Sequence, residues 1–464
     1  MAPQTSSSTV LAGIDVRRQL TAVGFALFFT FLGIAFFRDI PNDGVWWTDW
    51  MAFQTGARIV AQGDFEHLYD LEAQKQYQAE LTDGRSLEPP KFLHGVFISG
   101  VIGYYNAPSL ALILVPLSYV SVEVGWGIWL GFNVLFLILI FRICWKNLVR
   151  IWTPAEQWAA LAGALAFYPL IVILHGGQLT LLICLILCCF VFSWRNNRPY
   201  LAGVYLALLL IKPQLLIYLG LGVLFGRAWK VLLSTCLSTV VMVVATSLVM
   251  GHRIWLDWFL LLRKAGNFQE EFGIIPWGMY NLRGFFYVVL YPDHLDWMNL
   301  LTNFCFLIGA CLVIWIWCQV PGPWRQNTSK LADDVKDEPK AATMASNSPN
   351  SIPLFDLKIA VPLFLMLPLS PHLYRHTAYL ALIPAILTYH QLRTLPKHPI
   401  IYGWYLVVSL FIFYIASFKA VMTPESLDVG ARLATMILLG HASFTIKMFL
   451  DERSKMKYTP LLEN

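Results

Sequence analysis

Uncharged apolar runs about as long as a bilayer is thick recur along this chain, and they limit its fold more than any other feature. A helix needs roughly 20 apolar residues to cross the hydrocarbon core of a membrane. Hydrophobic residues make up 57% of the chain and charged residues only 13%, unlike a soluble domain. The sequence therefore predicts an all-α polytopic membrane protein. Long runs lie at 20–37, 124–141, 158–174, 178–194, 231–250, 298–320, 399–418 and 433–446, and shorter ones at 353–371 and 377–391.

The run from Leu20 to Phe37 follows Arg17 and Arg18 and has no small-residue cleavage site after it. We therefore expect a membrane anchor with a cytosolic N-terminus instead of a removed signal peptide. The eight cysteines lie in or beside apolar runs without metal-site spacing, so we interpret them as packing residues. The Lys and Arg residues are scattered over short loops, which argues against nucleic-acid binding.

Two stretches leave the number of crossings open. Residues 106–120 form a short run, and residues 201–225 carry Lys212 and Pro213 in their middle. If neither stretch crosses fully, the chain has about ten spans and its basic clusters all fall on the cytosolic side, as the positive-inside rule expects. If both cross, there are twelve spans and 142–198 changes sides. We favour the first version. The basic clusters are Arg142/Lys146/Arg150, Arg195/Arg198, Arg227/Lys230, Arg325 to Lys340, Arg393/Lys397 and Lys447 to Lys457.

The favoured topology divides the chain into five segments. They are a cytosolic N-terminus (1–19), a transmembrane core (20–320) with outer loops 38–105 and 251–297, a flexible cytosolic loop (321–352), C-terminal transmembrane helices (353–450) and a cytosolic tail (451–464). Four polar motifs then emerge on the side opposite the cytosol, where we expect them to form one site. They are "WWTDW" (46–50), "HGGQ" (175–178), "GMYNLRGF" (278–285) and "SPHLYRH" (370–376).

Asp49 stands between tryptophans at the start of a segment, 49–62, that alternates apolar and polar residues. This pattern predicts an interfacial helix, with Trp46, Trp47 and Trp50 in the headgroup belt. A partly desolvated acid there suits a general base acting on a hydroxyl. The alternative is that Asp49 only caps the helix.

Lys212 lies inside an apolar stretch, where a charged side chain costs about 2.5 to 3.5 kcal/mol unless it meets an anion or water. Pro213 breaks the helix at the same point. A short hairpin tipped by Lys212 and Gln214 accounts for both features. The alternative is that Lys212 extends to the interface from a tilted helix.

Further cations accompany the other motifs: Arg283, Arg375 and His376. Several cations facing a carboxylate at a lipid boundary suggest a phosphate in the lipid plane. The alternatives are a loop residue for Arg283, an interface anchor for 374–376, and a tight turn for His175 to Gln178. No Gly-rich phosphate loop, HExxH or GxSxG motif is present.

Five blocks carry a family resemblance, and they occur in order along the chain. They are "DWMAFQTGARIVAQGDFEHLYD", "NAPSLALILVPL", "GGQLTLLICLIL", "LAGVYLALLLIKPQLLIYLGLGVLFGRAWK" and "LSPHLYRHTAYLALIPAIL". Together they resemble glycosyltransferase family 87, a GT-C group that includes polyprenyl-phosphate-mannose-dependent α-mannosyltransferases. The resemblance implies a GT-C fold with about 10–12 transmembrane helices, juxtamembrane helices in the outer loops and a catalytic acid in the first outer loop, here Asp49.

The resemblance also implies a polyprenyl-phosphate-sugar donor, with mannose the expected sugar, and a glycolipid or glycan acceptor. On this interpretation transfer inverts the anomeric carbon, no cofactor or metal is needed, and the site faces outward from a bacterial plasma membrane. The competing hypothesis is a transporter or lipid flippase, which also needs broken helices and a buried Lys. The expected site residues are Asp49 as base, Lys212, Arg283, Arg375 and His376 on the donor phosphate, and His175, Gln178, Gln214, His372 and Trp50 on substrate.

Overall fold

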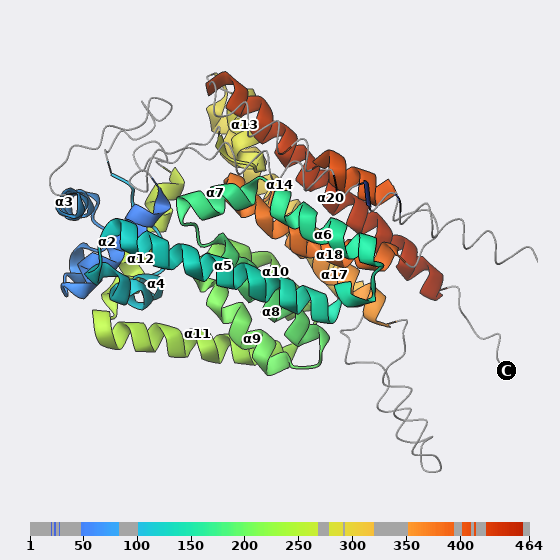
Figure 1. The fold of residues 1–464 in the computed structure, drawn as a ribbon, viewed down its shortest axis with the longest axis horizontal. Coiled ribbons are helices and arrows are strands. Elements are labelled where there is room, and N and C mark those ends of the chain that lie inside the picture. The colour runs from blue at the N-terminus through green and yellow to red at the C-terminus, as the bar shows by residue number, and fades with distance from the viewer. Residues whose placement is uncertain are drawn as a thin grey trace, which may run out of the picture.

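The computed structural model describes residues 48–82, 101–267, 278–290, 293–319, 351–393, 401–409 and 424–457, with Leu20, Val23, Gly24, Leu27 and Phe413 besides. Every regular element in these residues is a helix, which confirms the all-α prediction (Figure 1). Most of the expected anchor at 20–37 and nearly all of the loop at 321–352 lie outside the described residues, as do Trp46 and Trp47.

The α-helices run in the following order, with 3-10 segments between some of them. They are α2 (Asp49–Ala61), α3 (Leu71–Leu81), α4 (Pro108–Leu114), α5 (Val122–Asn147), α6 (Pro154–Ala166), α7 (Pro169–Gly176), α8 (Thr180–Arg195), α9 (Pro199–Leu208), α10 (Pro213–Phe225), α11 (Trp229–Met250), α12 (Arg253–Asn267), α13 (Leu282–Leu290), α14 (Leu295–Gln319), α17 (Ser351–Leu365), α18 (Leu382–Leu392) and α20 (Pro424–Lys457). The 3-10 segments used below are η4 (Val115–Tyr119), η6 (Leu209–Ile211) and η8 (Arg375–Ala381).

Four described helices are long and apolar enough to cross a membrane, and a fifth span results if α6 and α7, bent by 50°, count as one. The four spans are Val122–Asn147, Trp229–Met250, Asp296–Gln319 and Gly430–Ser454. Other apolar segments form shorter helices, among them Thr180–Arg195 and Pro213–Phe225. The protein is therefore a polytopic membrane protein, in which long spans alternate with short or broken helices.

One end of the bundle, which we call the Arg195 end, collects the ends of α5, α8 and α18 and the start of α17. Arg195 donates to both carboxylate oxygens of Asp356, at 2.9 and 3.2 Å, and Gln391 donates to the same carboxylate at 2.8 Å. Asn196 donates to Asn147 at 2.9 Å. Helices α5 and α8 therefore run parallel and finish together. These contacts bring basic clusters that are distant in sequence to one end of the molecule.

The opposite end, which we call the Asp49 end, gathers α2, α3, α4 and α12 at one side of the bundle (Figure 1). Trp50 Nε1 donates to the carbonyl of Val122 at the start of α5, at 2.9 Å. Trp258 in α12 donates to the carbonyl of Tyr105, at 3.0 Å, just before α4. The start of α5 and the helices of the two outer segments thus lie together.

Residues 199–234 leave the Arg195 end and return to it. Ser234 Oγ in α11 donates to the carbonyl of Tyr200 in α9 at 2.6 Å, so the two helices start side by side. Between them the chain turns at Lys212 and comes back through α10. Helices α9 and α10 therefore form a hairpin with Lys212 at its tip.

Residues 106–120 do not cross the bundle either. The carbonyl of Asn106 accepts from Tyr69 at 2.9 Å, and that of Ser118 accepts from Arg58 at 3.2 Å. Both ends of the segment therefore contact the α2 to α3 region.

Helix α2 corrects one prediction. The sequence pattern predicts an interfacial helix, but almost every residue from Trp50 to Val60 is buried against other helices of the protein. The polar residues that suggested a wet face bind protein carbonyls instead: Gln54 donates to Leu117 and Val120, each at 3.0 Å. Leu117 lies in the 3-10 segment η4 and Val120 directly follows it, so these carbonyls are free to accept. Trp50, fully buried, is consequently absent from the headgroup belt.

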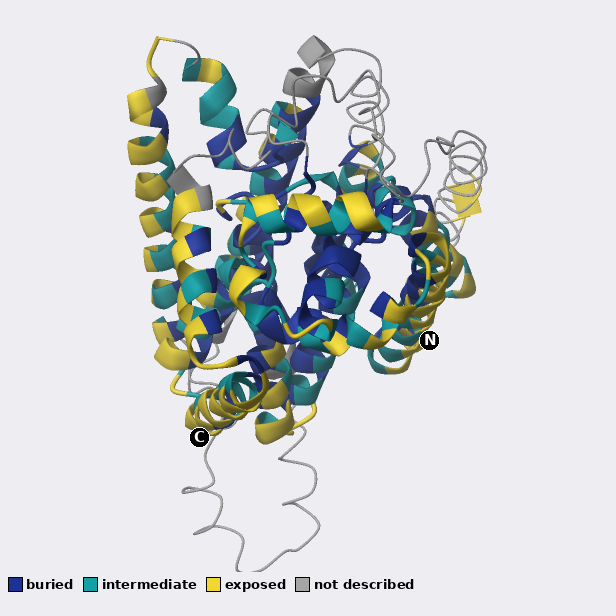
Figure 2. Ribbon diagram, turned by 90° about the vertical axis from the view of Figure 1, so that its left-hand side faces the viewer, coloured by how far each residue is buried: buried dark blue, intermediate teal, exposed yellow. Residues whose placement is uncertain are grey.

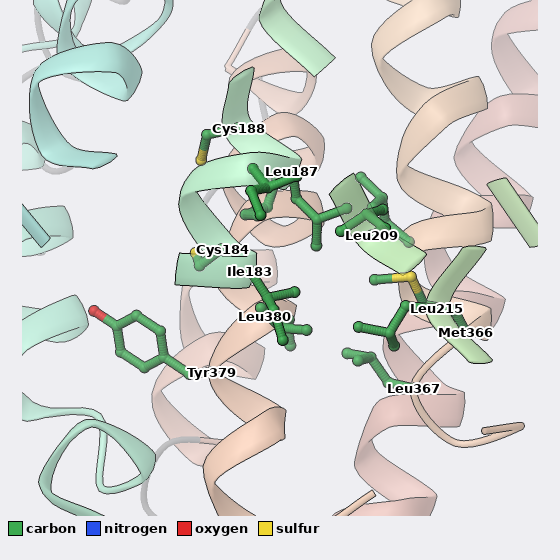
Figure 3. Packing of buried hydrophobic residues seen from close by; sticks show 14 of the residues in the cluster. Ile183, Cys184, Leu187, Cys188, Leu209, Leu215, Met366, Leu367, Tyr379 and Leu380 are labelled. Carbon is green, nitrogen blue, oxygen red and sulfur yellow. The ribbon is translucent and has the colours of Figure 1, made fainter. Parts of the chain in front are cut away.

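Buried residues gather in the middle of the bundle, and exposed residues lie on the outer faces of its helices (Figure 2). Next to the Asp49 end, the core is formed by α8, by the hairpin of α9 and α10, and by the chain from α17 to η8. Figure 3 shows Ile183 and Leu187 of α8 beside Leu209, Leu215 and Leu380. Each of these five side chains is buried. This packing fixes the hairpin tip relative to the start of α8.

Candidate active site

Asp49 is the first residue of α2, and Thr48 is the N-cap. The side chain of Asp49 forms a hydrogen bond with Gln178 and interacts electrostatically with Lys212, so the capping interpretation does not describe its main contacts. Burial raises the pKa of Asp49 above the usual carboxyl range, while the Gln178 hydrogen bond and the Lys212 charge act in the opposite direction. A carboxylate with an elevated pKa and an adjacent cation has the properties of a general base.

Gln178 follows a turn that two tryptophans of α5 hold in place. Gly177 ends α7 in the left-handed region at φ 60°, a conformation that glycine adopts without a steric penalty. Trp129 Nε1 donates to the carbonyl of Gly177 at 2.8 Å, and Trp126 Nε1 donates to that of His175 at 3.3 Å. A Cβ at Gly177 would lie 2.9 Å from Trp50 Cβ. The glycine therefore allows the turn to approach the start of α2.

Lys212 occupies the tip of the hairpin of α9 and α10. The 3-10 turn η6 precedes it, with Lys212 N donating to Leu209 O at 2.8 Å, and Pro213 starts α10 directly after it. Proline suits the first helical position, because its missing N–H would have no partner there. This local geometry explains why a cation can occupy an apolar stretch: it faces the carboxylate of Asp49 instead of lipid.

The segments 279–284 and 368–373 are joined by backbone hydrogen bonds. Tyr280 N donates to Leu373 O at 2.7 Å, and Leu282 N donates to Pro368 O at 2.8 Å. The side chain of buried Asn281 adds two hydrogen bonds of 2.8 Å. Its Nδ2 donates to Ser370 O, and its Oδ1 accepts from Gly284 N at the start of α13. Arg283 and the "SPHLYRH" residues are consequently held on one scaffold.

The same scaffold faces Lys212. The charges of Arg283 and Lys212 both act on His372, and those of Lys212 and Arg375 act on His376. Burial, Arg283 and Lys212 together lower the pKa of His372, in the loop before η8, to about 4. Its imidazole is thus neutral at physiological pH, and its buried Nδ1 has no hydrogen-bond partner among the described residues. A neutral imidazole beside two cations is a ready donor or acceptor for a bound polar group.

Four helices begin at this cluster. Asp49 starts α2, Gln178 precedes α8, Lys212 caps α10 and Arg283 lies in the first turn of α13. Backbone N–H groups at helix starts carry partial positive charge, so together with Lys212 and Arg283 they make the site electropositive. Asp49 adds a carboxylate to this environment. The arrangement suits an anionic ligand placed next to a base.

The structure brings most of the predicted residues together. Asp49, Gln178, Lys212 and His372 interact directly or electrostatically, and Arg283, Arg375 and His376 belong to the same network. Others have different surroundings. Trp50 is enclosed, with its N–H bound to Val122, and its ring stacks on Trp129 at 6.0 Å between centroids.

Two further predicted residues lie beside the network. Gln214 lies in the first turn of α10 and is partly exposed. None of the described residues forms a hydrogen bond with its side chain. The backbone carbonyl of His175 accepts a hydrogen bond from Trp126 and so helps to hold the turn before Gln178.

Three supporting residues have no role assigned from the sequence: Trp129, and Asn281 and Ser370, which lie inside the motifs 278–285 and 370–376. Trp129 is separated from the turn it holds by a whole helix pair, and its only signal is its place in an apolar run. The sequence does indicate a capping role for Asn281, because Asn directly before a helical pattern is typical of an N-cap. No motif indicates that its amide binds a loop far along the chain.

No group of three or more His, Cys, Asp or Glu side chains that could hold a metal ion occurs in the part of the chain that the structure describes. Residues 104–332, about half of the chain, match the model of Glycosyltransferase family 87. No curated protein and no solved structure matches the chain. The matched region contains Gln178, Lys212 and Arg283, while Asp49 and 370–376 lie outside it and join the site through the contacts above. This membrane protein belongs to glycosyltransferase family 87.

Proposed function

We propose that the protein transfers a sugar, with mannose the first candidate, from a polyprenyl-phosphate donor to a glycolipid or glycan acceptor. Family membership supports glycosyl transfer and gives no comparable support to the transporter or flippase hypothesis. The observation that carries the proposal is the contact of Asp49 with Gln178 and Lys212 at the tip of the hairpin. This arrangement sets a base beside a cation at the boundary between lipid and water.

The proposed reaction is a single displacement. Asp49 takes the proton of the acceptor hydroxyl as its oxygen forms the new bond to the anomeric carbon. The bond from that carbon to the phosphate oxygen breaks on the opposite face, so the configuration inverts. The leaving polyprenyl phosphate carries away the electron pair of the broken bond. Preorganised cations and helix starts stabilise its negative charge in a site that largely excludes water.

The residues assigned to the leaving phosphate fall into two sets. Lys212 is nearest to Asp49 and is assigned to the phosphate directly. Arg283, which directly follows the Leu282 that bonds to Pro368, is assigned to the remaining phosphate oxygens together with Arg375 and His376. His372 and Gln214 are assigned to sugar hydroxyls, because both have polar atoms without protein partners in the described structure. The site is proposed to open on the outer face of a bacterial plasma membrane.

A donor panel tests the proposal. The purified full-length protein, reconstituted in liposomes with a mixed glycolipid acceptor fraction, is incubated separately with radiolabelled polyprenyl-phosphate mannose, polyprenyl-phosphate glucose and the corresponding nucleotide sugars. We expect label in the acceptor fraction from a polyprenyl-phosphate sugar and none from nucleotide sugars. Transfer from nucleotide sugars alone would overturn the donor assignment.

A further inference from the structure

Helix α10 has two faces of different character. Its inner face packs tightly: Leu215, Tyr218 and Leu219 are buried, and Tyr218 Oη donates to the carbonyl of Phe306 in α14 at 3.0 Å. Gly222 belongs to this face, since a Cβ there would lie 2.9 Å from the ring of Trp317. The inner face of α10 is thus fully accounted for by packing.

The outer face of α10 carries a row of apolar residues at helical spacing. Pro213, Ile217, Gly220 and Leu224, which we call the α10 stripe, fall on one side of the helix. Ile217 is 42% exposed and Leu224 41% exposed. The stripe begins next to Lys212 and extends roughly 17 Å along the helix, at 1.5 Å per residue. It therefore starts at the candidate site and runs toward the Arg195 end.

Gly220 leaves open space in the middle of this stripe. No atom lies within 4 Å of the position that its Cβ would take, so packing does not explain the glycine as it explains Gly222. Glycine inside a helix weakens it relative to alanine. Gly127 and Gly131 on α5 are equally open, so openness alone does not mark a binding surface. What distinguishes Gly220 is its place on the row that leads away from Lys212.

The neighbours of α10 continue the same apolar surface. Helix α10 packs against α11 and against α14, both long enough to span the membrane. These two helices expose apolar side chains, including Leu237 of α11 and Phe304 of α14. The stripe consequently joins the lipid-facing surface of the protein at one end and a cationic site at the other.

We propose that the α10 stripe binds the isoprenoid chain of the lipid donor while Lys212 holds its phosphate, an inference that rests on the proposed function. An amphiphile with a phosphate at one end and a long branched hydrocarbon matches a surface with a cation at one end and open apolar space beyond it. The direction of α10 also agrees with this proposal. The hairpin tip lies at the Asp49 end, and a chain that follows α10 runs from there toward the middle of the bilayer.

Matched glycine variants test the inference by kinetics. Gly220→Phe fills the stripe without removing any packed side chain, and Gly131→Phe adds the same ring to an equally open position on α5. With a long-chain donor, we expect Gly220→Phe to raise KM roughly tenfold, as if about two methylene groups lost contact. With a donor of two isoprene units, KM of the same variant should stay near that of the wild type. Equal effects of the two variants would overturn the inference.

Photo-crosslinking separates this inference from the proposed function, because it needs no sugar transfer. The probe is a polyprenyl phosphate with a diazirine on its second or third isoprene unit, within the roughly 17 Å that the stripe extends. It is bound to the wild-type protein in liposomes, and the labels are mapped by mass spectrometry. Labels on residues 216–225 that unlabelled polyprenyl phosphate displaces support the stripe, even if no donor proves active. Labels elsewhere, or labelling that ordinary phospholipid displaces equally well, contradict it, even if transfer from a polyprenyl-phosphate sugar is observed.

Discussion

The side chain of Gln178 hydrogen-bonds the carboxylate of Asp49, so the turn between α7 and α8 meets the first residue of α2. This contact joins a residue inside the region matched by the family with one outside it. It also affects the charge state of Asp49, because a hydrogen bond to a carboxylate favours the ionised form and lowers its pKa.

Replacing Gln178 by Leu should therefore change the pH dependence of the enzyme. Without the hydrogen bond the pKa of Asp49 rises further, so the base stays protonated to higher pH. We expect kcat near neutral pH to fall about tenfold and the acidic limb of the pH–rate profile to move to higher pH. A lower rate with an unmoved acidic limb would show that Gln178 only supports the fold.

Lys212→Met removes the cation assigned to the donor phosphate and keeps an apolar stem in an apolar setting. We expect kcat/KM for the lipid donor to fall about 10- to 100-fold, the range for losing one charge-assisted hydrogen bond. Lys146→Met, near the Arg195 end of α5, is the matched control and should behave like the wild type. Unchanged donor kinetics in Lys212→Met would leave the phosphate assignment without support.

The two ends of the bundle should lie on opposite sides of the membrane. Asn196, near the Arg195 end, and Pro371, near the Asp49 end, are exposed and suit single-cysteine labelling. In intact cells an impermeant maleimide should label Pro371→Cys from outside and label Asn196→Cys only after permeabilisation, as the positive-inside rule predicts. Labelling of Asn196→Cys in intact cells would reverse the orientation.

The ion pair of Arg195 with Asp356 should contribute strongly to stability. Its carboxylate is fully buried, and removing one partner of a buried pair costs about 3–5 kcal/mol. Asp356→Ala should therefore lower the Tm measured by tryptophan fluorescence in detergent. The control is Asp257→Ala, whose pair with Arg253 is exposed and 3.6 Å long, and is worth about 0–1 kcal/mol. Similar shifts in both variants would contradict the structural role of the Arg195 end.

The sequence predicts those features of the fold whose physical signal is local. A lysine in an apolar stretch and a proline directly after it indicate a broken, re-entrant segment, because lipid cannot satisfy a free charge or free backbone groups. The hairpin of α9 and α10 follows this reasoning. The sequence also predicts that the four polar motifs lie together, and the structure brings residues of all four into one network.

The sequence pattern gives the wrong environment where polar side chains bind backbone groups that are distant along the chain. Gln54 and Arg58 give α2 the pattern of a half-wet helix, yet their partners are carbonyls of residues 117–120. A pattern of polar residues reports that hydrogen bonds are needed and leaves open whether water or protein supplies them. The contact of Trp129 with Gly177 was out of reach for the same reason.

The rate of sugar transfer by Asp49→Asn tests the central claim most directly. Asparagine keeps the shape of the side chain but cannot accept the proton, and loss of a general base typically lowers the rate about 10²- to 10⁴-fold. Asp64→Asn is the matched control: it lies in the same outer segment, and its carboxylate binds His67 and Tyr77 instead of the site. We predict that Asp49→Asn loses transfer while its Tm is unchanged, and that Asp64→Asn stays active. A fully active Asp49→Asn enzyme would contradict the assignment of Asp49 as the base.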